Sequence, residues 1–135
     1  MKFMLTFVRD QDDMYEATDE EMRAAMDAWT AFDKEAVEAG ALIACEPLEL
    51  PKTAKTIELA PSGTATVIDG PFAETKEQLG GFAQLECGDL DETMEWARKV
   101  PMGHGKIEVR KVMDLSPWGY ESSTVPPAKA KARAA

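Results

Sequence analysis

The chain has 135 residues, a length that suits a single domain. Hydrophobic residues make up 44% of it and charged residues 30%, so it has enough apolar material for a core and the composition of a soluble protein. Its formal net charge of -10 at pH 7 argues against a nucleic-acid-binding protein, which needs a basic surface to neutralise phosphates. The same charge disfavours an anionic membrane surface as a partner.

The first residues, MKFMLTFVRDQDD, predict neither a signal peptide nor a membrane span. The apolar run is broken at Arg9 and Asp10, and no window of the chain approaches the roughly 20 apolar residues that a span needs. We therefore expect a cytoplasmic protein. Cys45 and Cys87 lie far apart in apolar, strand-like segments, and neither has a CxxC spacing. This favours two buried thiols over a disulfide or a catalytic cysteine.

A first strand is predicted at residues 2–9, with apolar side chains on both faces. Its alternate positions form two sets, Phe3, Leu5 and Phe7 on one side and Met4, Thr6 and Val8 on the other. Such a strand needs cover on both sides of its sheet. The acid-rich loop that follows is interpreted as solvated rather than as a cation site, because it lacks the glycine and the distal glutamate of a calcium loop.

Two amphipathic helices are predicted. Thr18 and Glu21 form a capping box that starts the first, and Gly40 is a stop signal after it. The apolar stripe of this helix is Met22, Ala25, Met26, Trp29, Phe32 and Ala36. The second helix begins near residue 89 or 91 and ends before Pro101, at about Lys99. Its predicted buried face is Leu90, Met94 and Ala97.

The remaining elements predict an α+β fold. Strands are expected at about 41–47, 54–60, 64–69, 80–87 and 106–113, with a short helical segment near 74–79. This order reads as a ferredoxin-like, split βαβ sheet with both helices on one face. The other face is left bare, and a dimer that stacks sheet on sheet is its simplest cover. We expect a domain at 1–113 and a tail at 114–135 that is partly docked and then disordered.

Residues on two predicted strands are candidates for a site between the stacked sheets. One strand offers the aromatic Phe82 and the polar Gln84 and Glu86, and the last strand offers Glu108 and Arg110. Buried charges must be paired, so Arg110 is a predicted partner of Asp69, Glu86 or Glu108. Arg110 then either fixes the dimer through a salt bridge or binds an anionic ligand in a small pocket.

Asp69 ends a predicted strand directly before Gly70 and Pro71. An aspartate there either bonds backbone N–H groups of its own turn or serves as a general base or polar anchor at the mouth of a cleft. Phe72 is interpreted as core or pocket wall, and Lys76 as a surface residue or a ligand contact.

No established catalytic motif is present. His104, the single histidine, lies in a flexible Met-Gly-His-Gly turn with no second histidine and no cysteine nearby, so it has no metal-ligand spacing and is a weak catalytic candidate. There is no GxSxG, no P-loop and no GxGxxG. No metal and no cofactor are predicted.

The stretch from Val67 to Phe82, VIDGPFAETKEQLGGF, resembles the signature of the DGPF group of YCII-related proteins. The matching pieces are MKFML at 1–5, DGPFAETKEQLGGF at 69–82, DLDE and EWA within 89–97, and IEVR at 107–110. The resemblance covers about residues 1–113 and implies a small protein that forms a dimeric α/β barrel. It implies no reaction, because the family has no settled general activity. Some members are encoded near, or fused to, extracytoplasmic-function sigma factors.

The sequence departs from one feature that the resemblance implies. YciI-type relatives are thought to use a His–Asp pair whose histidine lies on the first helix. Aligned on the glycine that ends this helix, that position falls near Trp29, which is core or pocket wall and no acid–base group. The histidine that usually precedes the proline after the second helix is also absent, since Val100 stands before Pro101. A mechanism built on those histidines is therefore not supported here.

We predict a homodimer that binds a small anionic or polar metabolite in a cavity between the sheets. Asp69 is its candidate acid–base group. The candidate ligand-binding residues are Arg110, Phe72, Lys76, Trp29 and Glu108. The alternative is a non-catalytic regulatory or protein-interaction module, which the resemblance would link to sigma-factor systems. Whether the protein is an enzyme stays open.

Overall fold

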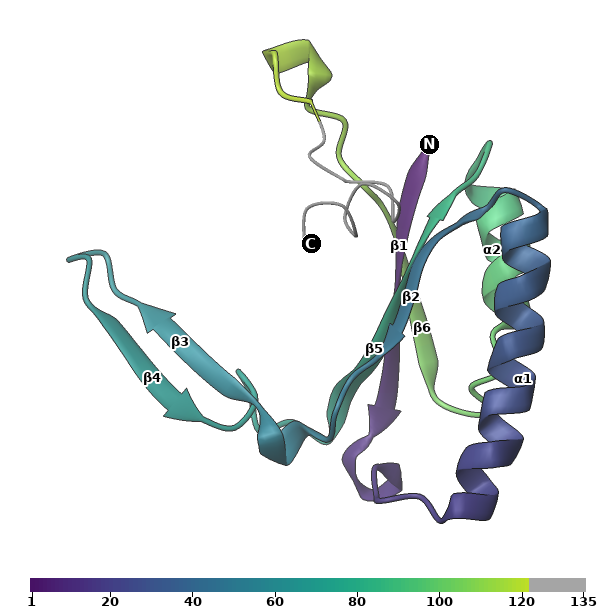
Figure 1. Cartoon of the computed structure of the whole chain (residues 1–135). Helices are drawn as coiled ribbons and strands as arrows, with labels where there is room; N and C mark the ends of the chain where they lie inside the picture. The colour runs from purple at the N-terminus through teal and green to yellow at the C-terminus, as the bar shows by residue number, and fades with distance from the viewer. Residues whose placement is uncertain (122–135) are drawn as a thin grey trace, which may run out of the picture.

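A computed structural model of the protein describes residues 1–121 (Figure 1). The helices are α1 (Asp19–Glu38) and α2 (Leu90–Lys99), and the strands are β1 (Lys2–Asp10), β2 (Leu42–Pro47), β3 (Lys55–Leu59), β4 (Ala65–Asp69), β5 (Glu77–Glu86) and β6 (Lys106–Lys111). Short 3-10 turns lie at η1 (Gln11–Asp13), η2 (Pro51–Thr53) and η3 (Ser116–Trp118). The predicted disorder of the last ten or so residues concerns positions outside the described part.

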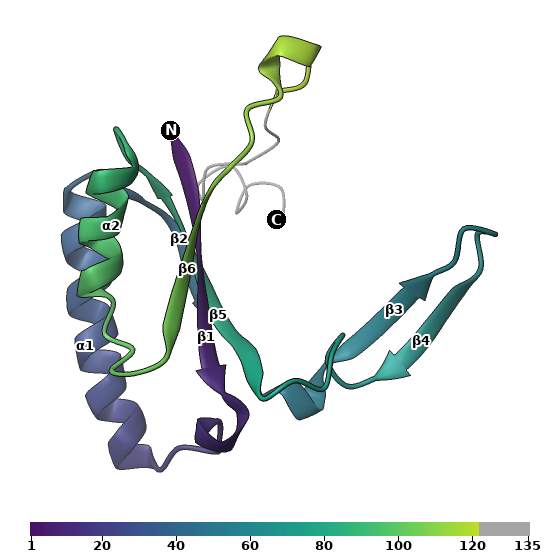
Figure 2. The ribbon, with the colours of Figure 1, turned by 180° about the vertical axis from the view of Figure 1, so that it is seen from behind.

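Four strands form one antiparallel sheet in the order β2-β5-β1-β6. In chain order β1, α1, β2, β5, α2 and β6 give the split βαβ pattern, and both helices cover the same face of the sheet (Figures 1 and 2). The predicted ferredoxin-like α+β fold is therefore confirmed. The sheet of one chain is open and forms no closed barrel.

Strands β3 and β4 form a separate two-stranded sheet that is inserted between β2 and β5. We call this hairpin, residues 55–69, the arm. It projects from one end of the main sheet, on the side away from the helices (Figures 1 and 2). The two predicted strands at 54–60 and 64–69 therefore pair with each other and not with the main sheet.

The core lies between the sheet and the helices. Phe3, Leu5 and Phe7 of β1 are at most 5% exposed and point to the helices, as their alternation predicts. Aromatic rings link the layers: the centroid of Trp29 is 5.5 Å from that of Phe7 and 6.0 Å from that of Phe32. Trp29 is therefore part of the core packing.

The opposite side of the sheet, the bare face, has no cover from the described part of the chain. Strand register shows that Met4 lies opposite both Gln84 and Arg110. The residues predicted to share a face on the strands at 80–87 and 106–113 therefore do lie on one face. The bare face consists of Lys2, Met4, Thr6, Val8, Asp10, Ala44, Glu46, Glu77, Leu79, Phe82, Gln84, Glu86, Lys106, Glu108 and Arg110.

The predicted helical segment near 74–79 is wrong. Residues 71–76 form bends and irregular structure, and β5 already begins at Glu77, which pairs with Asp10. The side chain of Gln78 is 5% exposed and donates hydrogen bonds to the carbonyl oxygens of Ala73 (2.9 Å) and Thr75 (3.0 Å). Pairing with β1 and these bonds hold the segment extended, and they outweigh the weak helical preference of its charged residues.

The predicted apolar stripe of α1 is only half buried. Phe32 and Ala36 lie in the core, whereas Met22 and Met26 are 49% and 57% exposed. The first turns of α1 extend past the end of the sheet (Figure 1), and Glu21, Met22 and Ala25 line a hollow there instead of packing on a strand. In α2, Ala97 is buried as expected, but Thr93 replaces Leu90 as the second buried residue.

Both cysteines are free, and Cys87 is 4% exposed while Cys45 is half-buried. Burial, followed by the nearby charges of Asp33 and Glu46, raises the pKa of Cys45 from 9.0 to about 11. Burial also raises the pKa of Cys87. Neither thiol is poised as a nucleophile, because the thiolate is the reactive form.

We expect slow labelling of Cys45 by a thiol reagent near pH 8, because a pKa raised by about two units leaves about a hundredfold less thiolate. The substitution Asp33→Asn removes a negative neighbour, so it should speed labelling at Cys45 and leave Cys87 unchanged. Site-resolved mass spectrometry of the native protein measures both rates. Labelling of native Cys45 as fast as in the unfolded chain would contradict this account.

The second glycine of the Gly80-Gly81 pair is fixed by packing. A Cβ at Gly81 would lie 2.9 Å from the carbonyl oxygen of Glu46 and 3.2 Å from the ring of Phe7. At Gly80 a Cβ would lie 3.2 Å from the flexible end of Met14. Gly81→Ala should therefore destabilise the fold by about 1–3 kcal/mol. Gly80→Ala is the matched control and should cost clearly less, as urea unfolding would show; equal losses would count against the packing explanation.

Candidate functional site

Asp69 lies at the base of the arm in an exposed ion pair. Its side chain is 84% exposed and accepts a hydrogen bond from the ammonium group of Lys55, its neighbour across the hairpin. No histidine or second carboxylate has a recorded contact with it in residues 1–121. Within one chain Asp69 thus has the environment of a surface ion pair, and its acid–base role stays a prediction.

The other residues expected near Asp69 do not converge on one place. Phe72 is 86% exposed, so it is not part of the core of its own chain. Lys76 lies 3.4 Å from Asp10, and Trp29 packs on the helix side of the sheet. On Asp10, the hydrogen bond from the backbone of Asp12 is the first cause of a lowered pKa, and Lys76 adds to it.

Arg110 and Glu108 form the pair that the sequence predicts on the bare face. The Nε atom of Arg110 is 3.2 Å from Glu108 Oε1, and both side chains are exposed in the single chain. The structure thus selects Glu108 from the three predicted partners of Arg110.

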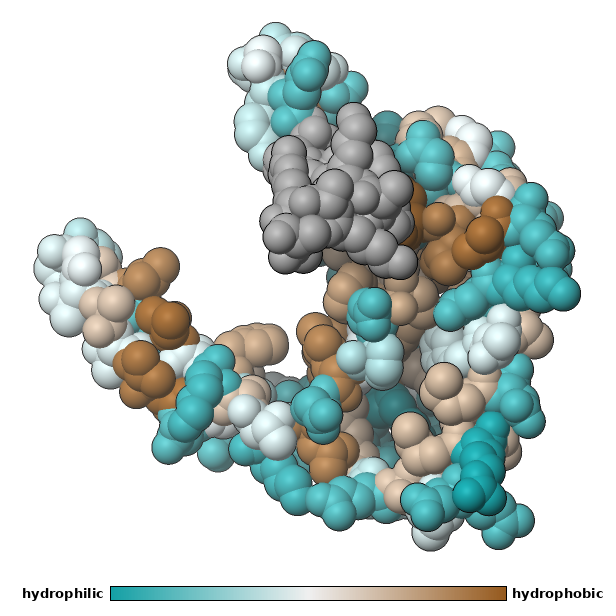
Figure 3. All heavy atoms as spheres, viewed as in Figure 1, coloured by the Kyte–Doolittle hydropathy of each residue, from teal (hydrophilic) through white to brown (hydrophobic). Residues whose placement is uncertain are grey.

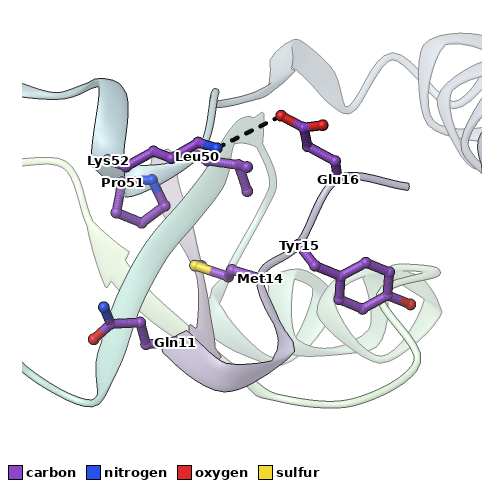
Figure 4. A pocket seen from close by; sticks show the side chains of 7 residues that line it. All are labelled: Gln11, Met14, Tyr15, Glu16, Leu50, Pro51 and Lys52. Atoms are coloured by element: carbon purple, nitrogen blue, oxygen red, sulfur yellow. Dashed lines mark ion pairs between the residues drawn. The ribbon is translucent and has the colours of Figure 1, made fainter. Parts of the chain in front are cut away.

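A groove opens on another part of the molecule. It lies between the connection from β1 to α1 and the connection from β2 to β3, and it consists of two adjoining hollows with volumes of about 380 and 370 Å³. The hollows share Met14, Tyr15, Leu50 and Pro51. Figure 4 shows the outer hollow, where Glu16 and Lys52 meet from opposite sides at 3.5 Å.

The inner hollow is lined by Arg9, which belongs to a three-residue polar cluster. Arg9 Nη2 is 3.1 Å from His104 Nε2, and the same His104 nitrogen is 3.4 Å from Asp13 Oδ2. The Nε atom of Arg9 is buried and has no hydrogen-bond partner among residues 1–121. A buried donor without an acceptor is costly, and because this atom has no exposed surface, a ligand in the hollow would contact Arg9 through its terminal nitrogens.

Glycine positions His104 next to Arg9. Gly105 has a φ of +111°, and a Cβ there would lie 2.6 Å from the carbonyl oxygen of Val8. Only glycine lets the chain enter β6 this close to β1. Since Lys106 pairs with Val8, the residue two positions earlier reaches the end of β1.

His104 Nε2 faces a cation and an anion, so its contacts depend on its protonation state. In the neutral ring this nitrogen accepts a hydrogen bond from Arg9, and in the protonated ring it donates to Asp13. The cluster therefore has an acid–base group with a carboxylate neighbour, which the Asp69 turn lacks.

Tyr15 and Glu21 also line the inner hollow and form a second polar pair there. Tyr15 donates a hydrogen bond of 2.9 Å to Glu21 Oε2, and Thr18 donates one of 3.1 Å to Glu21 Oε1. The bond to Glu21, and then its charge, raises the pKa of Tyr15. Thr18 also caps α1 as predicted, accepting from the backbone N–H of Glu21.

The groove lining has both signs of charge. Its ionised residues are Arg9, Lys52, Asp13, Glu16, Glu21 and Glu49. Apolar side chains of Met14, Leu48 and Leu50 lie between them. No group of three or more metal-ligating side chains occurs in residues 1–121. This lining suits a small molecule with an acceptor group for Arg9, a cationic group for the carboxylates and a short apolar body.

Sequence reasoning missed this cluster. In the sequence Arg9 stands out only as the residue that ends an apolar run, and 95 positions separate it from His104. The signal was available at the level of topology, because an antiparallel last strand beside β1 brings the loop before it to the end of β1.

Replacement of Asp69 tests the exposed-pair interpretation. Because solvent screens an exposed ion pair, Asp69→Asn should change the free energy of unfolding by less than about 0.5 kcal/mol. Urea unfolding measures this, with Lys55→Gln as the matched change at the other partner. A loss several times larger in the Asp69 variant alone would show that Asp69 has partners beyond Lys55.

Comparison with known proteins agrees with the fold and its signature. The family model of the YCII-related domain matches residues 1–116. The uncharacterised protein R00369 of Rhizobium meliloti (strain 1021) is 39% identical over 101 residues, which cover 73% of this chain and 81% of the relative. None of the helices within residues 1–121 has the length and apolar character to cross a membrane. The chain belongs to the YCII-related family.

Proposed function

We propose that this protein binds a small zwitterionic metabolite in the groove and works as a homodimer. The observation that carries the ligand proposal is the position of Arg9, which lines the inner hollow within hydrogen-bond distance of His104 and close to Asp13. The rest of the inner hollow supplies carboxylates and apolar side chains rather than further cations.

The charges of the inner hollow favour a ligand with two ends. A carboxylate would accept hydrogen bonds from Arg9, since charge-assisted bonds to a guanidinium are among the strongest available to it. An ammonium group would approach Glu21 or Asp13, which also line this hollow. A purely anionic ligand would meet more negative than positive groups, so the expectation of an anionic or polar ligand narrows to a zwitterion.

The homodimer is supported by the bare face. Met4, Val8 and Phe82 lie on it only partly buried, although the opposite side of the same strands forms the core. A second copy that stacks its own bare face here would bury them. In such a dimer Glu108 and Arg110 would line the space between the sheets, and Asp69, Phe72 and Lys76 would remain candidates for a ligand site at the base of the arm.

Binding, rather than a named reaction, is what the groove supports. If the ligand is also transformed, His104 with Asp13 is a better acid–base candidate than Asp69, because it has a carboxylate neighbour and touches the Arg9 that would hold the ligand. We place this activity in the cytoplasm, and the two free thiols support that location.

A protein-interaction role is the second candidate. Trp118 is 77% exposed and Tyr120 55% exposed beside η3, on a segment that stands away from the sheet. Exposed aromatic side chains are typical anchors of a partner surface. A chain that ends at Met113 and keeps ligand binding but loses a protein partner would assign the aromatic segment to this role.

Ligand-detected NMR with free amino acids, short carboxylic acids and short amines tests the main proposal. Free amino acids should bind best, and Arg9→Gln should weaken their binding at least about tenfold, because a charged hydrogen bond is lost. Arg23→Gln is the control, since Arg23 is exposed on α1 and does not line the groove. If no probe binds, or if binding survives Arg9→Gln in a folded protein, the groove is not the site.

A further inference from the structure

The arm has two chemically different sides. On one side Ile57 lies opposite Val67, and Leu59 lies opposite Ala65. The other side shows Thr56, Glu58 and Thr66, with Ile68 near its base. Ile57, Val67 and Leu59 are 61%, 65% and 79% exposed, so this side of the arm is apolar and exposed beyond the Lys55–Asp69 pair at its base.

No part of residues 1–121 covers this apolar side. Figure 3 shows hydrophobic atoms along the side of the arm that looks toward the sheet across an open space. Phe72, just after the arm, is 86% exposed as well. An isolated two-stranded hairpin is marginally stable in water, and a contiguous exposed apolar surface usually marks an interaction site.

We propose that a second copy of this chain sits between the arm and the bare face, so that the apolar side of each arm packs on its partner. The inference deepens the proposed homodimer and depends on it. It names the arm as a clasp that holds the partner molecule, in addition to any contact between the two sheets.

Charge supports a second copy as the occupant. The protein has a net charge of -10, and helix α1 alone contains seven acidic and two basic residues. On the arm, the charges are Lys55 and Asp69, which pair with each other, and Glu58, which lies on the polar side. The apolar side of the arm is thus close to neutral, and two copies can approach there without like-charge repulsion.

The bare face is balanced in the same way. Its carboxylates are paired in four cases, as Asp10 with Lys76, Glu77 with Lys106, Glu86 with the N-terminal amine, and Glu108 with Arg110. The surplus acid lies on the helices, on the other side of the sheet. Both walls of the open space therefore carry little net charge and include apolar side chains, so a second copy of this acidic chain can approach them.

A pair of double variants tests the clasp. Ile57→Gln with Val67→Gln places two amides on the apolar side of the arm, and Glu58→Gln with Thr66→Gln places them on the polar side of the same strands. Sedimentation velocity over a dilution series should give a wild-type dimer. The first variant should dissociate at a concentration at least about tenfold higher, because each lost aliphatic contact weakens the interface. The second should behave like the wild type.

A third variant separates the clasp from the dimer itself. Thr6→Lys places a charge in the middle of the bare face and should weaken any dimer in which the sheets stack. If Thr6→Lys dissociates and the Ile57 and Val67 variant does not, the homodimer stands and the clasp is wrong. If the wild type is a monomer at every concentration, both are wrong. Unfolding midpoints of the monomers control for damage to the fold, since the arm lies outside the core.

Discussion

The pairing of β1 with both β5 and β6 is the constraint on which the rest of the molecule depends. Strand β1 runs antiparallel to each of them and shares nine residue pairs with β5. Its alternate side chains make the core on one side and the bare face on the other. Its end carries Arg9 toward His104 because β6 starts there, so the fold and the groove arise from the same ladder of hydrogen bonds.

The molecule divides its surface by chemistry. The helices carry the surplus of acidic residues and keep one side of the protein well solvated. The bare face carries four ion pairs and one further carboxylate, Glu46, and the apolar side of the arm carries the Lys55–Asp69 pair. This separation explains how a strongly acidic chain can associate with itself, since repulsion acts mainly between surfaces that need not meet.

Local signals predicted the elements well, and long-range contacts decided where they failed. Thr18 and Glu21 marked the start of α1, and the alternation of Phe3, Leu5 and Phe7 marked the buried side of β1. The segment at 74–79 looked helical by composition, but pairing with β1 extended it. The Arg9 and His104 cluster was not predicted, because their contact depends on strand order and on the room that Gly105 leaves beside Val8. The Asp-Gly-Pro turn made Asp69 a candidate site residue. Its exposure depends on where the arm lies in space, which a sequence pattern does not predict.

The turn η2 has two neighbours that belong to different proposals. Pro51 and Lys52 line the groove, and three residues later the same segment becomes β3 of the arm. A force that reorients the arm therefore acts on one wall of the groove. If docking of the arm changes ligand affinity in the groove, the ligand must change the dimer dissociation constant by the same factor. The short turn that contains Pro51 would then couple dimerisation to ligand binding.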